Sequence, residues 1–212
     1  MKINLTKLGK RFNRDWIFRN LDFQFNEGKH YAITGPNGSG KSTLLQIISG
    51  SSIFNEGTIN YFVNDTSFPS EKIFQKLSFA APYLDMIEEM TLTEFFSFHH
   101  KMKGWFPTLD TKEIISLLSL EDAAHKQIRY FSSGMKQRVK LAQAIFSDVP
   151  MVLLDEPLTN LDEEGVLLYH YLIEKFCKNR LLIISSNDKK EYSFCNEIID
   201  IRVYKKDASI SN

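Results

Sequence analysis

The residues with the clearest capacity for chemistry form the stretch "GPNGSGKST", residues 35–43. It matches G-x-x-x-x-G-K-[ST] and lies between an apolar run, "HYAIT", and an amphipathic run, "STLLQIISG". A strand, a glycine-rich turn and a helix N-terminus in this order form a phosphate-binding loop. We therefore predict that this stretch binds the phosphates of a nucleotide. The residues expected to do so are Gly35, Pro36, Asn37, Gly38, Ser39, Gly40, Lys41, Ser42 and Thr43.

Individual residues of this loop have separate expected roles. The glycines let backbone N–H groups curl around phosphate oxygens without obstruction by a Cβ atom. Lys41 is expected to reach the β- and γ-phosphates, and the Ser42 hydroxyl is expected to bind Mg²⁺.

A second element expected in the same site is the run "MVLLDE" at 151–156. Four apolar residues followed by two carboxylates predict a buried strand that ends in acidic groups. Asp155 is then placed to hold Mg²⁺ through water, and Glu156 extends into the crevice where a carboxylate can polarise an attacking water. The alternative for Glu156 is an ordinary solvated loop carboxylate.

A third feature is "RYFSSGMKQR", residues 129–138, where small polar residues precede a basic helix. The first N–H groups of a helix have no partner within it and carry the positive end of its dipole. Ser132 is therefore either a simple N-cap or part of an anion site, and the same geometry serves both roles.

The composition excludes several classes of protein. The chain has 212 residues, 43% of them hydrophobic, and its 26 basic and 26 acidic residues cancel. We expect no nucleic-acid partner, because no broad positive field is present. The two cysteines, Cys177 and Cys195, lack the spacing of metal ligands, and no apolar run is long enough for a transmembrane helix or signal peptide. These observations predict a cytoplasmic protein.

The pattern of apolar residues predicts an α/β fold. Alternating residues indicate strands at 2–8 and 21–25, and further strands are expected at 30–34, 57–62 and 76–81. Residues 88–145 are predicted to be mainly helical, and strands at 151–155 and 181–185 flank a helix from Glu163 to about Lys178. A strand, a helix and a strand in succession favour a parallel sheet. The tail 205–212 is predicted to be loose.

Together the motifs resemble those of the nucleotide-binding subunits of ATP-binding cassette (ABC) transporters. The family has the phosphate loop, a signature of the form LSGGQ where this chain has "FSSGM", and an acidic strand where it has "LLDEP". The resemblance implies a P-loop NTPase core with a parallel sheet, an N-terminal antiparallel β subdomain and an inserted helical subdomain. Residues 1–212 would form one ABC-type domain, with the helical subdomain at about 86–140.

The resemblance also implies site residues and partners. Ser132, Ser133 and Gly134 would receive the γ-phosphate of ATP held by a second cassette, identical or different, and Asp162 in "LTNLD" would belong to the loop between the two subunits. Phe12 either stacks on adenine or packs in the core. The cofactors would be ATP and Mg²⁺. An integral membrane permease would hold the chain at the inner face of the cell membrane, with "MTLTEFFSFHHKMKGWF" as its docking segment.

Two positions depart from the family pattern. Pro82 stands where the family has a glutamine that serves Mg²⁺, and Asp85 is our hypothetical substitute. Asn187 stands where the family has a histidine that contacts the γ-phosphate, and an amide can donate a hydrogen bond but cannot move a proton at neutral pH. Together these departures predict intact ATP binding and slow hydrolysis, with Glu156 and Asn187 as the catalytic residues.

Three other functions remain as alternatives. A soluble ABC-type ATPase acting on DNA or ribosomes is disfavoured by the zero net charge. A regulatory module that holds ATP with little catalysis is suggested by Pro82 and Asn187 but opposed by the presence of Glu156. A GTPase is disfavoured because the chain has no N-K-x-D sequence.

Overall fold

The computed structural model describes residues 1–205. The tail predicted to be loose lies outside the described residues, except for Lys205. Within residues 1–205, no helix combines the length and the apolar character that a membrane crossing requires.

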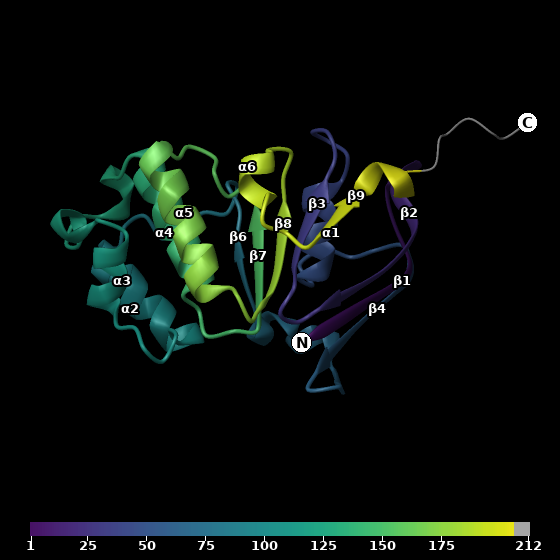
Figure 1. Cartoon of the computed structure of the whole chain (residues 1–212), viewed down its shortest axis with the longest axis horizontal. Coiled ribbons are helices and arrows are strands. Elements are labelled where there is room, and N and C mark those ends of the chain that lie inside the picture. Colours follow the sequence, from purple (N-terminus) through teal and green to yellow (C-terminus); the bar gives the residue numbers. More distant parts are fainter. Residues whose placement is uncertain (206–212) are drawn as a thin grey trace, which may run out of the picture.

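A five-stranded parallel sheet runs through the middle of the molecule (Figure 1). Its strands, in spatial order, are β6 Leu77–Ala80, β7 Met151–Asp155, β8 Leu181–Ser185, β3 His30–Thr34 and β9 Glu197–Asp200. Every neighbouring pair is parallel, so all the carboxyl ends lie at one edge. Ligands of such sheets bind at this edge. The predicted strands at 30–34, 76–81, 151–155 and 181–185 are confirmed, whereas β9 was not predicted.

The second sheet is antiparallel and lies beside the first. Its order is β2 Asp15–Asn26, β1 Lys2–Phe12, β4 Glu56–Val63 and β5 Thr66–Phe68. The first two strands are longer than predicted, because they continue to a tight hairpin in which Phe12 pairs with Asp15 and Asn13 has a φ of 54°. Asparagine tolerates this left-handed conformation better than most residues. The longer hairpin carries Phe12 toward the phosphate loop.

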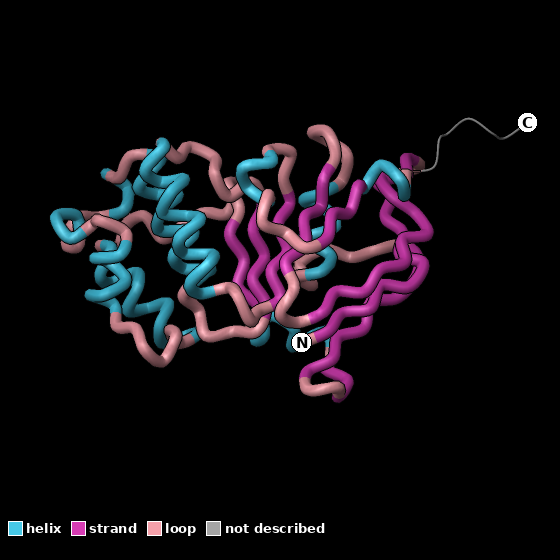
Figure 2. The backbone as a smooth tube through the Cα atoms, in the orientation of Figure 1, coloured by secondary structure: helices cyan, strands magenta, loops and turns pink. Residues whose placement is uncertain are grey.

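Helices pack on both faces of the parallel sheet, as the cyan segments of Figure 2 show: the first helix lies on the face that also carries the antiparallel sheet, and the other helices lie on the opposite face. Their bounds are α1 Lys41–Ile48, α2 Leu92–Lys103, α3 Thr111–Leu117, α4 Ser133–Ile145, α5 Glu163–Phe176 and α6 Lys189–Tyr192. Asp110 is the N-cap of α3 and forms a capping box with Glu113. Thr91 and Glu94 form the same motif at the start of α2.

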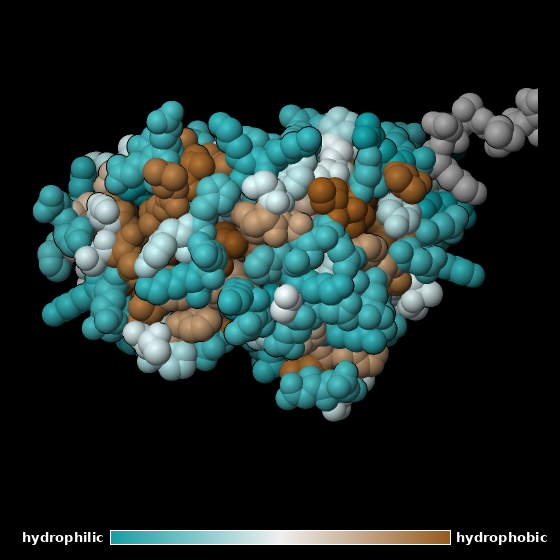
Figure 3. Space-filling view, in the orientation of Figure 1, coloured by the Kyte–Doolittle hydropathy of each residue, from teal (hydrophilic) through white to brown (hydrophobic). Residues whose placement is uncertain are grey.

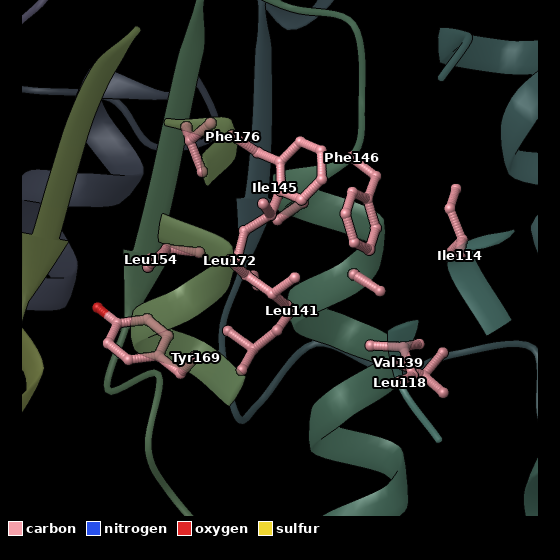
Figure 4. Packing of buried hydrophobic residues seen from close by; sticks show 14 of the residues in the cluster. Ile114, Leu118, Val139, Leu141, Ile145, Phe146, Leu154, Tyr169, Leu172 and Phe176 are labelled. Atoms are coloured by element: carbon pink, nitrogen blue, oxygen red, sulfur yellow. The ribbon is translucent and has the colours of Figure 1, made fainter. Parts of the chain in front are cut away.

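The parallel sheet separates two hydrophobic cores. Along β7, Met151 and Leu153 face the core shared with α1 and the antiparallel sheet, whereas Val152 and Leu154 face the core shared with the helices. This alternation follows from the two-residue period of a strand, and both faces are apolar because both are covered. Figure 4 shows the helical core, where Leu154 lies near side chains of α4 and α5 such as Leu141 and Leu172.

The surface is mainly hydrophilic, with hydrophobic patches over the helical half and near the C-terminal elements on the face shown in Figure 3. Large hydrophobic residues that are exposed include Met102, Leu167 and Val203.

Candidate nucleotide site

The phosphate loop joins the carboxyl end of β3 to the N-terminus of α1. Gly40 is the N-cap residue of α1, has a φ of 103°, and provides no side-chain cap for the helix. A Cβ atom at Gly40 would lie 2.2 Å from Cγ2 of Ile17, so a larger residue cannot be accommodated without displacement. The amide groups at the start of α1 are therefore uncapped by side chains and can bind an anion.

Lys41 is buried inside the loop that precedes it. Its Nζ atom donates to the carbonyl oxygens of Gly35, at 2.9 Å, and Pro36, at 3.3 Å. The loop thus holds the ammonium group beside the uncapped helix N-terminus. This arrangement concentrates positive charge where phosphate groups would lie.

A pocket of about 400 Å³ opens over the helix N-terminus. It brings together residues from the antiparallel sheet, the phosphate loop and the end of β7. The lining residues are Phe12, Ile17, Asn37, Gly38, Gly40, Lys41, Ser42, Thr43 and Glu156. Of these, Ile17 was not predicted. Gly35, Pro36 and Ser39 do not line the pocket but belong to the loop that forms its wall.

Phe12 is not a core residue, which excludes one of the two alternatives for it. Its side chain is 52% exposed and lies at the rim of this pocket. The Lys10 ammonium lies 4.7 Å from the centre of the Phe12 ring, and Lys10 is itself held by a hydrogen bond to the Ile53 carbonyl. A positioned, exposed ring at the rim of a phosphate pocket can stack on a nucleobase.

The residues predicted to bind Mg²⁺ fit that ion. Asp155 is only 2% exposed, and neither of its carboxylate oxygens has a hydrogen-bond partner in the described residues. A buried carboxylate without partners is costly, and a divalent cation would compensate it. Asp155 and the Ser42 hydroxyl supply the oxygen ligands that Mg²⁺ prefers. When bound with a nucleotide, Mg²⁺ neutralises charge on the terminal phosphates.

Glu156 follows Asp155 in a strained backbone conformation. Its φ is 43°, a left-handed value that is uncommon for residues other than glycine, and its N–H donates to the Ser185 carbonyl at 2.9 Å. Strain of this kind is concentrated at functional sites. The turn directs Glu156 into the pocket wall rather than along the strand.

Asn187 lies beside the phosphate loop, although 150 residues separate the two in sequence. Its Nδ2 atom donates to Oδ1 of Asn37 at 2.6 Å. Asn187 follows β8, which is adjacent to β3, so the sheet order brings the two loops together. The position is suitable for a group that contacts the terminal phosphate.

A second pocket, of about 430 Å³, lies at the N-terminus of α4. Ser132 caps that helix by accepting a hydrogen bond from the Met135 N–H at 3.2 Å, which confirms the predicted N-cap. The pocket is lined by Ser132, Gly134 and Asp162, with Ser119, Leu120, Asp122, Ala123, Met135, Arg138 and Asn160. Ser133 is exposed nearby but does not line the pocket. The predicted site residues therefore form two separate groups.

Asp162 connects the second pocket to α5. It is the N-cap of α5, accepts a hydrogen bond from the Gly165 N–H at 2.8 Å and pairs with Arg138 at 3.2 Å. The Gly165 N–H and Arg138 lower the pKa of the Asp162 carboxyl, so it is ionised at neutral pH. Gly134 packs closely here, because a Cβ atom on it would lie 3.2 Å from the Asn160 carbonyl oxygen.

In the segment after β6, Asp85 does not lie where we predicted. Asp85 lies in a different pocket, with Lys140 and Gln143, and not at the phosphate loop. The position of Asp85 therefore does not support it as a replacement for the family's glutamine. Lys140 instead ties this segment to α4, because its Nζ donates to the Pro82 carbonyl at 2.7 Å.

Tyr83, which sequence reasoning missed, lies near Asp155, one of the predicted Mg²⁺ ligands. Its hydroxyl accepts a hydrogen bond of 3.2 Å from Nε2 of Gln46, which lies one helical turn after Ser42 on α1. Ala80, the last residue of β6, pairs with Leu154, which directly precedes Asp155. Tyr83 follows Ala80 by three residues, so it lies just beyond the end of the strand next to Asp155. Partial burial and the nearby Asp155 carboxylate raise the pKa of Tyr83 to about 12, so the phenol stays protonated.

Comparisons with known proteins point to one family. A family model described as ABC transporter matches residues 18–159. An uncharacterized ABC transporter ATP-binding protein, YybJ of Bacillus subtilis, is 30% identical over an alignment that covers 97% of this chain and 100% of that protein.

Solved structures give the same result for the fold. A putative ABC transporter ATP-binding protein from Pyrococcus furiosus has a TM-score of 0.80 at 23% identity and covers 97% of this chain and all of its own. A bacterial ABC transporter cassette, MJ0796, described as dimeric, has a TM-score of 0.78 at 21% identity, with 94% of each chain covered. With the two sheets described above, these likenesses confirm the predicted α/β fold with a P-loop NTPase core.

Proposed function

The chain belongs to the ATP-binding cassette (ABC) transporter family, and we propose that it is an ATP-hydrolysing subunit that dimerises around ATP and powers a separately encoded permease. In this proposal residues 1–212 form one cassette, with residues 86–140 as its helical subdomain. The permease holds the chain at the inner, cytoplasmic face of the cell membrane.

The observation that carries the proposal is the separation of the site residues into two pockets. One holds Phe12, the phosphate loop and Glu156, and the other holds Ser132, Gly134 and Asp162. A nucleotide in the first pocket would leave the predicted residues of the second pocket, Ser132, Gly134 and Asp162, unused. A second cassette would complete each site, with the first pocket of one chain facing the second pocket of the other.

The proposed roles follow from the positions of the side chains. The α1 N-terminus, Lys41 and the loop amides bind the phosphates, and Asp155 and Ser42 hold Mg²⁺. Glu156 polarises the attacking water, and Asn187, which is bonded to Asn37, donates to the terminal phosphate. Tyr83 takes the place that we had assigned to Asp85, as the polar side chain beside the Mg²⁺ ligands.

We further propose that hydrolysis is slow. Asn187 can donate one hydrogen bond but cannot accept a proton at neutral pH, and loss of one preorganised stabilising donor costs about 10²- to 10³-fold in rate. A module that holds ATP with little catalysis is the second candidate, favoured by Pro82 and Asn187 and opposed by the position of Glu156 in the pocket.

The test is the solution mass of the Glu156→Gln variant by light scattering, with and without Mg²⁺ and ATP. Slow hydrolysis should trap the dimer, so the mass should double with Mg-ATP, and Ser132→Arg in the same background should prevent the doubling. A persistent monomer would contradict assembly from identical chains alone, and the permease or a different cassette would then be required. Phosphate release by the unmodified chain separates the two candidates: a slow, Glu156-dependent rate supports the subunit, whereas no release supports the holding module.

A further inference from the structure

Glu191 carries a buried carboxyl group that the proposed chemistry does not use. It lies on α6, four residues after Asn187, and is only 4% exposed. Its Oε1 atom accepts a hydrogen bond from the Leu158 N–H at 2.7 Å, whereas Oε2 is buried without a partner. Within residues 1–205 the carboxyl group takes part in none of the ion pairs. Burial of an uncompensated carboxyl costs free energy, so this placement requires an explanation.

The segment that Glu191 holds connects the two pockets. Pro157 and Leu158 follow Glu156 of the first pocket and lead to Asp162 of the second. This segment is held from two sides by side chains. From α4, Nε2 of Gln137 donates to the Pro157 carbonyl at 2.7 Å, and from α6, Glu191 accepts from Leu158. Both contacts thus hold the backbone directly after Glu156.

The element that carries Glu191 is itself firmly attached. The Tyr169 hydroxyl donates to the Glu191 backbone carbonyl at 2.7 Å, from the fully buried face of α5. Asp188 caps α6 by accepting from the Lys190 N–H, and the Asp188 N–H donates to the Ser186 hydroxyl. The carboxyl group thus has a fixed support, and Asn187 lies within the same supported segment.

We propose that Glu191 is a positioning residue for ATP hydrolysis: its carboxyl group fixes the Leu158 backbone and thereby holds Glu156 in register with Asn187. The inference rests on the proposed function in naming ATP hydrolysis as the reaction. The contact between Glu191 and Leu158 is independent of that function and can be tested without nucleotide.

The surroundings of Glu191 make this contact sensitive to pH. Burial raises the pKa of its carboxyl to about 7, opposed by the Ser186 hydroxyl and the Leu158 N–H and reinforced by the charges of Asp188 and Glu156. The other titratable group facing it, Tyr169, has a pKa raised well above its ordinary value by burial and is neutral throughout. Since the packed conformation favours the protonated carboxyl, the contact is most stable at low pH and weakens as the pH rises from about 5 to 7.

The primary experiment is hydrogen exchange at the Leu158 amide in the full chain without nucleotide. Corrected for intrinsic rates, the protection factor should fall about 20-fold between pH 5.5 and pH 7.5, because an opened segment exposes a carboxyl of ordinary pKa. Glu191→Gln keeps an acceptor for the Leu158 N–H but has no carboxyl group to titrate. In this variant the fall in protection between pH 5.5 and pH 7.5 should therefore be absent. Gln137→Met is the matched control, because it removes the other contact of the segment: it should lower protection and leave the pH dependence intact.

The second experiment measures ATP hydrolysis. Glu191→Ala should lower kcat by about 10- to 100-fold with KM for ATP changed much less, since misplacement of a catalytic group acts mainly on the transition state. Glu191→Gln should retain most of the kcat that Glu191→Ala loses. Unchanged Leu158 protection and unchanged kcat in both variants would overturn the proposal, as would a pH dependence of protection that survives in Glu191→Gln. An unmodified chain that hydrolyses no ATP would refute the proposed function alone, because the exchange experiment still decides whether Glu191 holds Leu158.

Discussion

The buried carboxyl of Glu191 should also affect the stability of the whole protein, with a dependence on pH that can be worked out in advance. Its pKa is about 7 in the folded protein, against an ordinary value of 4.5 that the unfolded chain should recover. Between these values the folded state binds more protons than the unfolded state. The free energy of unfolding must therefore fall as the pH rises through this window and level off above it.

The magnitude follows from the two pKa values. Between pH 5 and pH 8, Glu191 should lower the free energy of unfolding by roughly 2.5 kcal/mol. Other groups titrate over the same range, so the useful quantity is the difference between the unmodified chain and Glu191→Gln, in which their contributions cancel. That difference should move by roughly 2.5 kcal/mol in favour of the glutamine variant from pH 5 to pH 8, or about 5 to 10 °C in Tm for a chain of this size.

The assay is urea unfolding of both chains at several pH values, followed by fluorescence and circular dichroism. Glutamine places a buried amide where the carboxyl was, so at pH 5 we expect the variant to be the less stable of the two. As the pH rises, its relative stability should improve. A constant difference across the range would refute the reasoning, because it would mean that Glu191 has the same proton affinity in both states.

Three further predictions concern other residues. Asn187→His should raise kcat for ATP hydrolysis by about 10-fold or more, because it restores a group that can carry charge at the terminal phosphate; an unchanged rate in a phosphate-release assay would count against the proposed cause of slow turnover. For Tyr83→Phe, the ratio of the dissociation constants of ATP without and with Mg²⁺, measured by calorimetry, should fall by about 3- to 10-fold, which is the contribution of one hydrogen bond. An unaltered ratio would show that Tyr83 does not contribute to the Mg²⁺ site. Arg180→Met should lower Tm by roughly 6 to 12 °C, because Arg180 donates to the buried carbonyls of Ile145, Ser147 and Val149 at 2.5, 2.9 and 2.8 Å; a shift below 2 °C would show that those carbonyls find other donors.

The parts of the site that could be predicted are those in which chemistry and position lie in one short stretch. The phosphate loop is such a case, because a strand, the glycines and a helix N-terminus are contiguous in residues 30–48. The positions of Asp155 and Glu156 were predictable as well. The apolar run before them forms a buried strand, so the carboxylates that follow it lie at the end of that strand. The role of Ser132 needed the family resemblance, because an N-cap and a phosphate sensor have the same local pattern.

The substitutions at the edge of the site show where this reasoning fails. Pro82 was recognised as a departure, but the sequence led us to propose Asp85 as the replacement and to overlook Tyr83. The tertiary structure separates them: Tyr83 bonds to Gln46 on α1, whereas Asp85 lies near Lys140 on α4. Strand β9 was also missed, because a strand of four residues is too short to show a clear periodicity.

The sequence by itself determined the order of the elements, the α/β class and the chemistry of the phosphate loop, because strand and helix periodicity and turn residues act over a few neighbouring positions. Only the tertiary structure decided which distant residues share a site. It brings Asn187 to Asn37 across the order of the parallel sheet, places Phe12 at the pocket rim through the extended hairpin, and buries Glu191 against Leu158. These contacts span up to 150 residues and depend on strand order and helix packing, which no local pattern encodes.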